Sequence, residues 1–406
     1  MEYEQLFADR IGGSQFGKST EIYKFEKIKR AKAKARELQP DMEILDFGVG
    51  EPDQMAPLPI REALKVEVDL PENRGYADNG GPEFKQAAAD YMKKFFDVEL
   101  DPSTEINHSI GTKPALAMLP LAFVNPGDVV FQTVPGYPVM ATHSNYLGAE
   151  VVDIPLLEEN AFLPNLEDID PSLADRCKLF YINYPNNPTG AVATPEFYDG
   201  LIAFAKKHNI LIIQDAPYST LVYDGERTSL LQRPGAKECT LELHSMSKAY
   251  NMTGWRLAFF CGASWAVNAL AAIKDNCDSG QFKAIQKAAC AGIADESLAE
   301  GIRVHYEKRL RRLVEILREV GFDATMPGGT FFLYTKAPKG AGDVEFANAE
   351  EASLFLIENF GISTVPWDNT GPFIRFGAVF ESAGDDDDER VLNELSNRLK
   401  TADLKF

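Results

Sequence analysis

The sequence predicts an α/β fold, in which a mostly parallel sheet lies between two layers of helices and a smaller α+β domain lies beside it. Two observations lead to this prediction. Through the middle of the chain, short runs rich in Val, Ile and Leu alternate with helical stretches, and such nearly continuous apolar runs are typical of strands covered on both faces. Toward the C-terminus the pattern changes to amphipathic helices separated by short strand candidates.

Four apolar runs are expected to form strands of the central sheet: 129–132, 151–154, 178–182 and 210–213. Between the last two, residues 194–207 have helical periodicity, with Thr194 in the N-cap position and Pro195 in the first helical position. Strand, helix and strand in this order favour parallel neighbours. In the C-terminal part we expect helices at 299–320 and 388–400, and strands at 330–334, 362–365 and 373–376.

Size and charge exclude several classes of protein. A chain of 406 residues exceeds the usual size of one hydrophobic core, so we expect two domains. With 41 basic and 61 acidic residues the net charge is −20, which argues against non-specific binding to nucleic acid or to anionic membranes. The first residues are acidic and no apolar run is long enough to cross a bilayer, so neither a signal peptide nor a membrane span is expected.

The cysteines and histidines indicate neither disulfides nor a metal site. Five cysteines are scattered along the chain without a Cys-x-x-Cys motif, and the five histidines show no ligand spacing. Free thiols in a reducing cytoplasm fit this pattern better than disulfides do. We therefore expect a cytoplasmic protein without a structural metal.

The most informative stretch is Ser245-Met246-Ser247-Lys248, which follows an apolar run and is itself followed by Arg256. A lysine that forms an imine needs a dry pocket that favours its neutral amine, and nearby hydroxyl and guanidinium groups could hold the phosphate of a phosphorylated aldehyde. Gly111-Thr112-Lys113, at the start of a predicted helix, offers a second set of phosphate donors through its backbone N–H groups. Because most lysines are exposed surface charges, this interpretation depends on the residues that surround Lys248 in the sequence.

Three polar residues follow predicted strands and are therefore expected to converge. Asn187, Asp215 and Lys248 each come after an apolar run, and ligands of open α/β sheets gather at the carboxyl ends of the strands. A carboxylate at the end of an apolar strand is costly without a partner, although a helix N-cap or an ion pair would also satisfy Asp215. Asn187 lies in Asn-Asn-Pro-Thr-Gly, which is a good turn sequence in any protein.

Arg375 is a charged residue inside the apolar segment Phe373-Ile374-Arg375-Phe376. Because arginine is rarely buried without an anion, this position predicts either an internal ion pair or the capture of a substrate carboxylate. Bidentate binding of a carboxylate is the chemistry that the guanidinium geometry suits best.

Together, Asn186-Asn187-Pro188-Thr189-Gly190, Gln214-Asp215-Ala216-Pro217-Tyr218 and the lysine segment resemble the signature of fold-type I class I/II aminotransferases, which depend on pyridoxal phosphate (PLP). The resemblance covers nearly the whole chain. It implies a three-layer PLP-dependent transferase fold with a large PLP-binding domain at residues 53–295 and a small domain built from residues 1–52 and 296–406. It also implies a homodimer with active sites at the interface, acting on an amino acid and a 2-oxo acid.

The same resemblance implies roles for the candidate residues. Lys248 would bind the PLP aldehyde and later carry the Cα proton, while Asp215 would keep the pyridine nitrogen protonated. Tyr218 and Asn187 would contact the O3′ oxygen, and Tyr137 would stack on the ring. The phosphate contacts would come from Thr112, Lys113, Ser245, Ser247, Arg256 and, across the dimer interface, Tyr76.

Within this class, the chain is most similar to the LL-diaminopimelate aminotransferases of lysine biosynthesis. The aromatic pair in segment 22–28 precedes Phe47-Gly48-Val49-Gly50 at a spacing typical of those enzymes. Ser279-Gly280 stands where they carry Asn-Gly, and the loop around Tyr76 is one residue shorter. The similarity implies substrate contacts from Tyr23, Gly50, Asp78, Asn187, Ser279 and Arg375.

Other functions remain open at this point. An aminotransferase for aspartate or an aromatic amino acid, or a carbon–sulfur lyase, would use the same Lys, Asp and Arg residues, because PLP stabilises whichever carbanion forms. A binding or regulatory protein on the same fold would not need Lys248, and the chain shows no fused DNA-binding segment.

Overall fold

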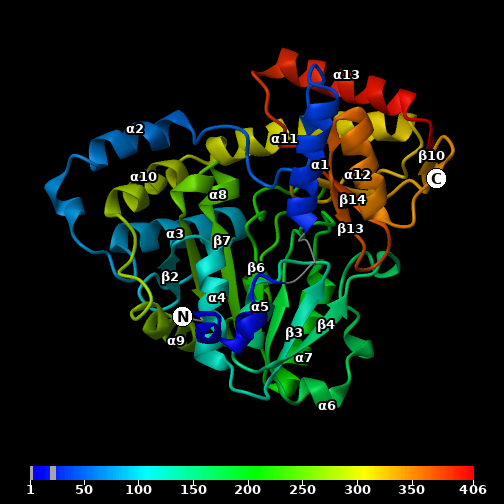
Figure 1. Cartoon of the computed structure of the whole chain (residues 1–406). Coiled ribbons are helices and arrows are strands. Elements are labelled where there is room, and N and C mark those ends of the chain that lie inside the picture. The colour runs from blue at the N-terminus through cyan, green and yellow to red at the C-terminus, as the bar shows by residue number, and fades with distance from the viewer. Residues whose placement is uncertain (1–2, 19–23) are drawn as a thin grey trace.

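The computed structural model describes residues 3–18 and 24–406. Its centre is a seven-stranded sheet, and the carboxyl ends of its parallel strands face the smaller domain (Figure 1). Strand β8 is antiparallel to both of its neighbours, whereas the other neighbouring pairs are parallel, so the prediction of a mostly parallel sheet is confirmed. The strands in spatial order are β2 (Ile106–Ser109), β8 (Ala258–Gly262), β7 (Thr240–Ser245), β6 (Leu211–Asp215), β5 (Cys177–Ile182), β3 (Val129–Val134) and β4 (Glu150–Pro155).

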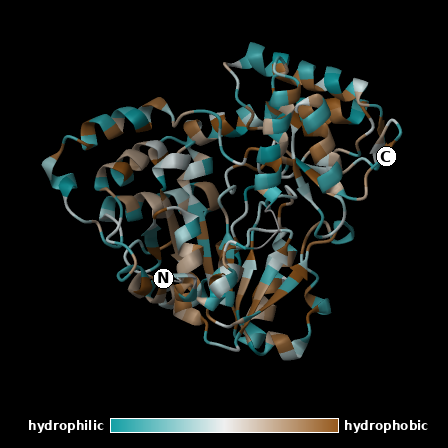
Figure 2. Cartoon of the chain, viewed as in Figure 1, coloured by the Kyte–Doolittle hydropathy of each residue, from teal (hydrophilic) through white to brown (hydrophobic). Residues whose placement is uncertain are grey.

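Alternate residues of these strands build two hydrophobic cores, one on each face of the sheet. Leu179 and Tyr181 of β5 pack toward α4 (Thr112–Phe123), α5 (Val139–Tyr146) and α9 (Ser264–Lys274). Phe180 and Ile182 pack on the opposite face, toward α3 (Pro82–Phe96), α7 (Pro195–His208) and α10 (Lys283–Ala294). The strands are accordingly hydrophobic along most of their length (Figure 2). This arrangement is the predicted three-layer α/β fold.

Local sequence signals explain several helix boundaries. The Thr194 hydroxyl accepts a hydrogen bond from the backbone N–H of Phe197, so Thr194 is the predicted N-cap of α7. The helix α4 begins at Thr112, directly after Gly111, which adopts a positive φ of 82° and ends the preceding loop. The helix α2 (Leu58–Glu67) packs against α10, and the short helices α6 (Pro171–Ala174) and α8 (Met246–Ala249) precede β5 and follow β7.

A third core unites residues from both ends of the chain. Leu45 and Phe47 pack with residues from α11 (Glu296–Glu319), α12 (Ala349–Phe360) and α13 (Asp385–Thr401). Strand β1 (Leu45–Asp46) pairs in parallel with β12 (Ile362–Ser363), and α1 (Lys24–Leu38) packs against α12. The antiparallel sheet of this region contains β13 (Val365–Trp367), β14 (Phe373–Gly377) and β9 (Phe332–Lys336), and a smaller one contains β11 (Val344–Glu345), β10 (Gly340–Ala341) and β15 (Leu404–Lys405).

Some expected elements differ from the observed ones. The strands β2 and β8 were not predicted, the strand expected at 330–334 lies two residues later, and the run 362–365 forms two short strands rather than one. Within residues 3–18 and 24–406, no helix is long and apolar enough to cross a membrane. All five cysteines are free thiols, and the described residues contain no group of three or more His, Cys, Asp or Glu side chains that could hold a metal.

Candidate active site

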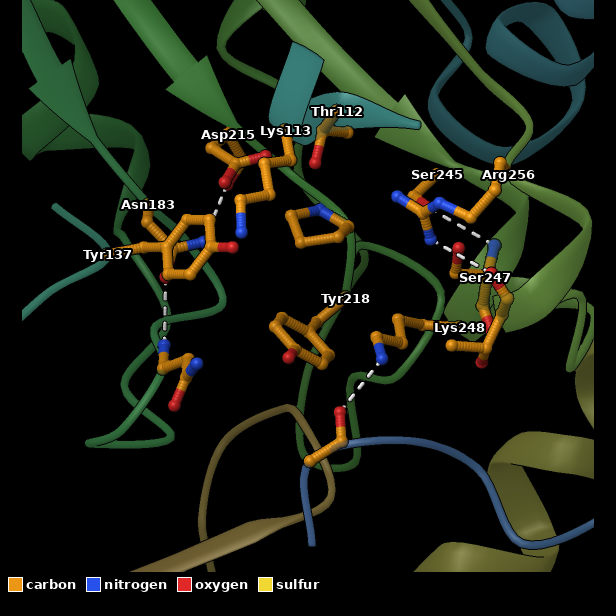
Figure 3. Close-up of a pocket in the computed structure, with 14 residues that line it drawn as sticks. Thr112, Lys113, Tyr137, Asn183, Asp215, Tyr218, Ser245, Ser247, Lys248 and Arg256 are labelled. Atoms are coloured by element: carbon orange, nitrogen blue, oxygen red, sulfur yellow. Dashed lines mark hydrogen bonds between the residues drawn. The ribbon is translucent and has the colours of Figure 1, made fainter. Parts of the chain in front are cut away.

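A cavity of about 450 Å³ lies at the carboxyl ends of β5, β6 and β7 (Figure 3). It collects side chains from segments that are far apart in the sequence, as the strand-end rule predicts. Eleven of the predicted site residues line it: Gly50, Thr112, Lys113, Tyr137, Asn187, Asp215, Tyr218, Ser245, Ser247, Lys248 and Arg256. Three further lining residues, Asn183, Pro217 and Thr253, were not predicted.

Lys248 reaches into this cavity from α8, which begins directly after β7. Its Nζ donates a hydrogen bond to the carbonyl of Gly50 at 2.8 Å. Burial lowers the pKa of Lys248 to about 8, and the positive charges of Arg256 and Arg375 act in the same direction, while Glu51 opposes them. A substantial fraction of the amine is therefore neutral near pH 8, as a nucleophilic lysine requires.

Asp215 is a buried carboxylate that lacks a cationic partner among the described residues. The Tyr181 hydroxyl donates a hydrogen bond to Oδ2 at 3.2 Å, while Oδ1 has no hydrogen-bond partner. Burial raises the pKa of Asp215 to about 7, against the opposing effect of the Tyr181 and Thr112 hydroxyls. A cationic donor placed against Oδ1 would satisfy this carboxylate, so neither a helix N-cap nor an ion pair within the described chain explains it.

Asn183, which the sequence analysis missed, holds two of the converging loops together. Its side-chain N–H donates to the Asp215 carbonyl at 2.6 Å, and its Oδ1 accepts from the backbone N–H of Asn187 at 2.9 Å. Because Asn183 directly follows β5, the rule that identified Asp215 after β6 would also have identified it.

Anion-binding groups gather at one end of the cavity. The N-terminus of α4 presents the backbone N–H groups of Thr112 and Lys113, and the Ser245, Ser247 and Arg256 side chains line the same cavity. Arg256 has a left-handed backbone with φ of 58°, and its Nη1 donates to the Thr253 carbonyl at 2.8 Å. A Cβ on Gly111 would overlap Nη2 of Arg256, so the glycine gives the guanidinium the space it occupies.

A second cavity of about 680 Å³ shares Gly50, Lys113, Tyr137 and Asn187 with the first. Arg375 of β14 lines this second cavity. Its Nη1 donates to Oδ1 of Asn187 at 2.9 Å and its Nη2 to the carbonyl of Gly48 at 3.2 Å, while Nε has no partner.

Arg375 therefore binds only neutral groups in the described part of the chain. Burial lowers its pKa to about 10, and its guanidinium carbon lies 4.0 Å from the centroid of the Phe332 ring. No carboxylate of the described residues forms an ion pair with it, so the arrangement favours an external anion over the internal ion pair that the sequence also allowed.

Three predicted residues lie outside both cavities, in one surface cluster. The backbone N–H of Asp78 donates to the carbonyl of Ser279 at 3.1 Å, and Lys274 donates to the Asp78 carbonyl at 2.7 Å. Tyr76 is 81% exposed. None of these residues is among the described ones that line the two cavities of the same chain. Tyr23 lies outside the described residues.

Comparison with known proteins identifies the family. Residues 42–378 match the family described as Aminotransferase class I and II. The chain belongs to this family. It is 51% identical to the LL-diaminopimelate aminotransferase of Methanocaldococcus jannaschii, and 51% identical to that of Methanococcus maripaludis, with 99% of each chain covered in both cases.

Solved structures agree with this assignment. Substrate-bound BacF from Bacillus subtilis superposes with a TM-score of 0.88 at 31% identity, covering 98% of each chain. An aspartate aminotransferase mutant from Thermus thermophilus superposes with a TM-score of 0.84 over 97% of this chain and 99% of its own, at 24% identity, which supports the shared fold. The transferase fold expected from the sequence is thereby confirmed.

Proposed function

We propose that this aminotransferase acts on LL-diaminopimelate, with 2-oxoglutarate as the amine acceptor and PLP as the cofactor, in lysine biosynthesis. The observation that carries the substrate assignment is the 51% identity over 99% of the chain to relatives named LL-diaminopimelate aminotransferase. The presence of Lys248 in the cavity supports turnover rather than a binding role.

The residues of the first cavity fit PLP. The unpaired Oδ1 of buried Asp215 suits a protonated pyridine nitrogen, and the Lys248 amine suits the aldehyde. The phosphate suits the N-terminus of α4 together with Ser245, Ser247 and Arg256. Tyr137 and Tyr218 line the space between these groups, where they would contact the ring and its O3′ oxygen.

PLP, when bound, supplies an electron sink for the carbanion that forms at the substrate Cα. The chain's own groups then divide the remaining work. Arg375 binds the substrate α-carboxylate and orients the Cα–H bond. Lys248 accepts the Cα proton at Nζ and returns it in the second half of the transfer, which its lowered pKa of about 8 makes feasible near neutral pH. Asp215 maintains the proton on the ring nitrogen.

We further propose a homodimer in which Tyr76, Asp78 and Ser279 serve the partner's active site. Their exposure as one cluster outside the cavities of their own chain supports this arrangement. The shared core of the chain ends supports a small domain of residues 1–52 and 296–406 and a large PLP-binding domain of residues 53–295. The free thiols support a reducing cytoplasm as the location.

An amino-transfer assay tests the proposed reaction. Purified protein with added PLP, LL-diaminopimelate and 2-oxoglutarate should form glutamate, measured with a coupled glutamate dehydrogenase. Absence of glutamate alongside turnover of aspartate or an aromatic amino acid would contradict the substrate assignment. Release of pyruvate and ammonia from cystathionine without any acceptor would instead indicate a carbon–sulfur lyase.

A further inference from the structure

Lys24, the first residue of α1, lies in the second cavity together with Arg375. Its side chain is half-buried, and its Nζ lies 3.4 Å from the centroid of the Trp367 ring. A cation held this close to an indole face is attracted by the ring but keeps its N–H donors available for an anion. No acceptor of residues 3–18 or 24–406 forms a hydrogen bond with Nζ, so this cation has hydrogen-bonding capacity for a ligand.

The carboxylates nearest to Lys24 are engaged elsewhere. Asp368 accepts hydrogen bonds from the backbone N–H groups of Ala349 and Glu350 at 2.8 and 3.2 Å, at the start of α12. The Glu350 carboxylate pairs with Lys27 at 2.6 Å. Among residues 3–18 and 24–406, neither carboxylate forms an ion pair with Lys24.

The second cavity therefore has an excess of positive charge. Lys24, Lys113 and Arg375 line it, and Asp153 is the one acidic side chain among its described lining residues. Burial lowers the pKa of Lys24 to about 8, and repulsion from Arg375 adds to this effect, against the weaker attraction of Asp368 and Glu350. A ligand carrying two negative charges would relieve the repulsion that half-buried Lys24 experiences from buried Arg375.

We propose that Lys24 is a specificity-determining residue that binds the distal carboxylate of a dicarboxylic substrate whose α-carboxylate lies on Arg375. This inference rests on the proposed function, in which LL-diaminopimelate, glutamate and 2-oxoglutarate all carry a second carboxylate. The site selects against monocarboxylic amino acids, because they would leave Lys24 without its anion.

Inert ligands test this site without requiring turnover. Pimelate has two terminal carboxylates and no amine, and heptanoate is the matched monocarboxylate. Isothermal titration calorimetry on the PLP-loaded protein should show that wild type binds pimelate more tightly than heptanoate. In Lys24→Met, we expect pimelate binding to weaken about 10- to 100-fold, as for the loss of one charge-assisted hydrogen bond, with heptanoate unchanged.

Two variants provide controls. Lys34→Met removes another lysine of α1, one that pairs with Glu358 and leaves the Lys27–Glu350 pair intact, and it should bind both ligands as wild type does. Lys24→Arg should retain part of the preference for pimelate. Pimelate binding that is unchanged in Lys24→Met, or that weakens no more than heptanoate binding, would overturn the proposal.

The catalytic assay separates this proposal from the proposed function. In Lys24→Met, kcat/KM for LL-diaminopimelate and for 2-oxoglutarate should fall mainly through KM, while kcat changes little. If wild type fails to turn over LL-diaminopimelate but loses its pimelate preference on Lys24→Met, the substrate assignment is wrong and the dicarboxylate site stands. If turnover occurs and the pimelate preference survives Lys24→Met, the site is wrong and the assignment stands.

Discussion

Nη1 of Arg375 donates a hydrogen bond to Oδ1 of Asn187 at 2.9 Å, which joins the C-terminal sheet to the loop that follows β5. The two residues are 188 positions apart in sequence. Asn187 lines both cavities, so this contact places the Arg375 guanidinium, which has no carboxylate partner among the described residues, at the point where the cavities meet. The hydrogen bond thereby links the proposed cofactor cavity to the arginine that we propose binds the substrate carboxylate.

The first prediction concerns Arg375. We expect Arg375→Gln to lower kcat/KM for amino acid substrates on the order of 100-fold, because a charge-assisted pair with the α-carboxylate is lost. PLP should still bind to the variant, because Arg375 lines only the second cavity. Steady-state kinetics with a parallel spectrum check this. Wild-type kcat/KM in the variant would contradict the assigned role.

The second prediction concerns Gly111, whose missing side chain leaves space for Arg256. Gly111→Ala should displace the guanidinium and weaken PLP binding by about 10-fold or more, because a phosphate contact is lost. Gly127→Ala is a matched control: Gly127 has a similar positive φ of 85°, but no atom lies near its Cβ position. Equilibrium dialysis measures PLP affinity. Equal weakening in both variants would show that backbone strain alone explains the effect.

The third prediction concerns the covalent attachment of the cofactor. Reduction of the PLP-loaded protein with borohydride should fix PLP to wild type at Lys248, which peptide mass spectrometry detects, and should leave Lys248→Ala unlabelled. Activity of the variant should fall at least 10²- to 10⁴-fold, the range for loss of a general acid–base. Label found on another lysine of wild type would refute the assignment.

Much of the first cavity could be predicted because strand order translates directly into position. Asp215 is the last residue of β6 and Lys248 lies shortly after β7. Because these strands are parallel neighbours, their carboxyl ends must meet at one edge of the sheet. Arg375 was identified as an unusual charge in an apolar strand, but no sequence pattern gives the register that brings it to Asn187. The hydrogen bond from the Tyr181 hydroxyl to Asp215 could not be predicted either, because it depends on the pairing of β5 with β6.

The missed elements have physical reasons too. Strand β2 has the sequence Ile-Asn-His-Ser, and its three polar residues are buried. Hydropathy cannot detect such a strand, because several of its polar groups form contacts that only the fold supplies: the Asn107 side chain, for example, donates to Asn79. The location of Lys24 over Trp367 likewise requires α1 and β13 to be in place, although the two lie far apart in sequence.

The fourth prediction uses the raised pKa of Asp215. Since its folded-state pKa of about 7 exceeds the ordinary aspartate pKa of 3.8, the native PLP-free protein keeps this proton to a higher pH than the unfolded chain does. The contribution of Asp215 to the free energy of unfolding is therefore most favourable below pH 4. This contribution, about 4 kcal/mol at most, is lost as the pH rises to about 7. In the PLP-free protein, Asp215→Asn should raise the melting temperature more at pH 8 than at pH 5.

Loading with PLP supplies the control for this experiment. A pyridinium against Oδ1 would stabilise the charged carboxylate, so the advantage of Asp215→Asn at pH 8 should disappear or reverse when PLP is bound. Differential scanning calorimetry at the two pH values, with and without PLP, measures all four conditions. A stability difference that is independent of pH in the PLP-free proteins would show that the buried carboxylate does not titrate in this range.

The fifth prediction tests whether Tyr76 serves the partner subunit. Lys248→Ala and Tyr76→Ala should each be strongly impaired alone. In a mixed dimer, the subunit with Tyr76→Ala contributes Lys248 to its own site and receives Tyr76 from its partner. One complete site therefore forms, and the other site lacks both groups.

Mixing the two variants after reversible dissociation should therefore restore activity. Because one site in two is complete, each mixed dimer should reach up to about half the activity of a wild-type dimer. If Tyr76 acted within its own chain, each mixed dimer would carry one site without Lys248 and one without Tyr76, and the activity would stay at the average of the two variants.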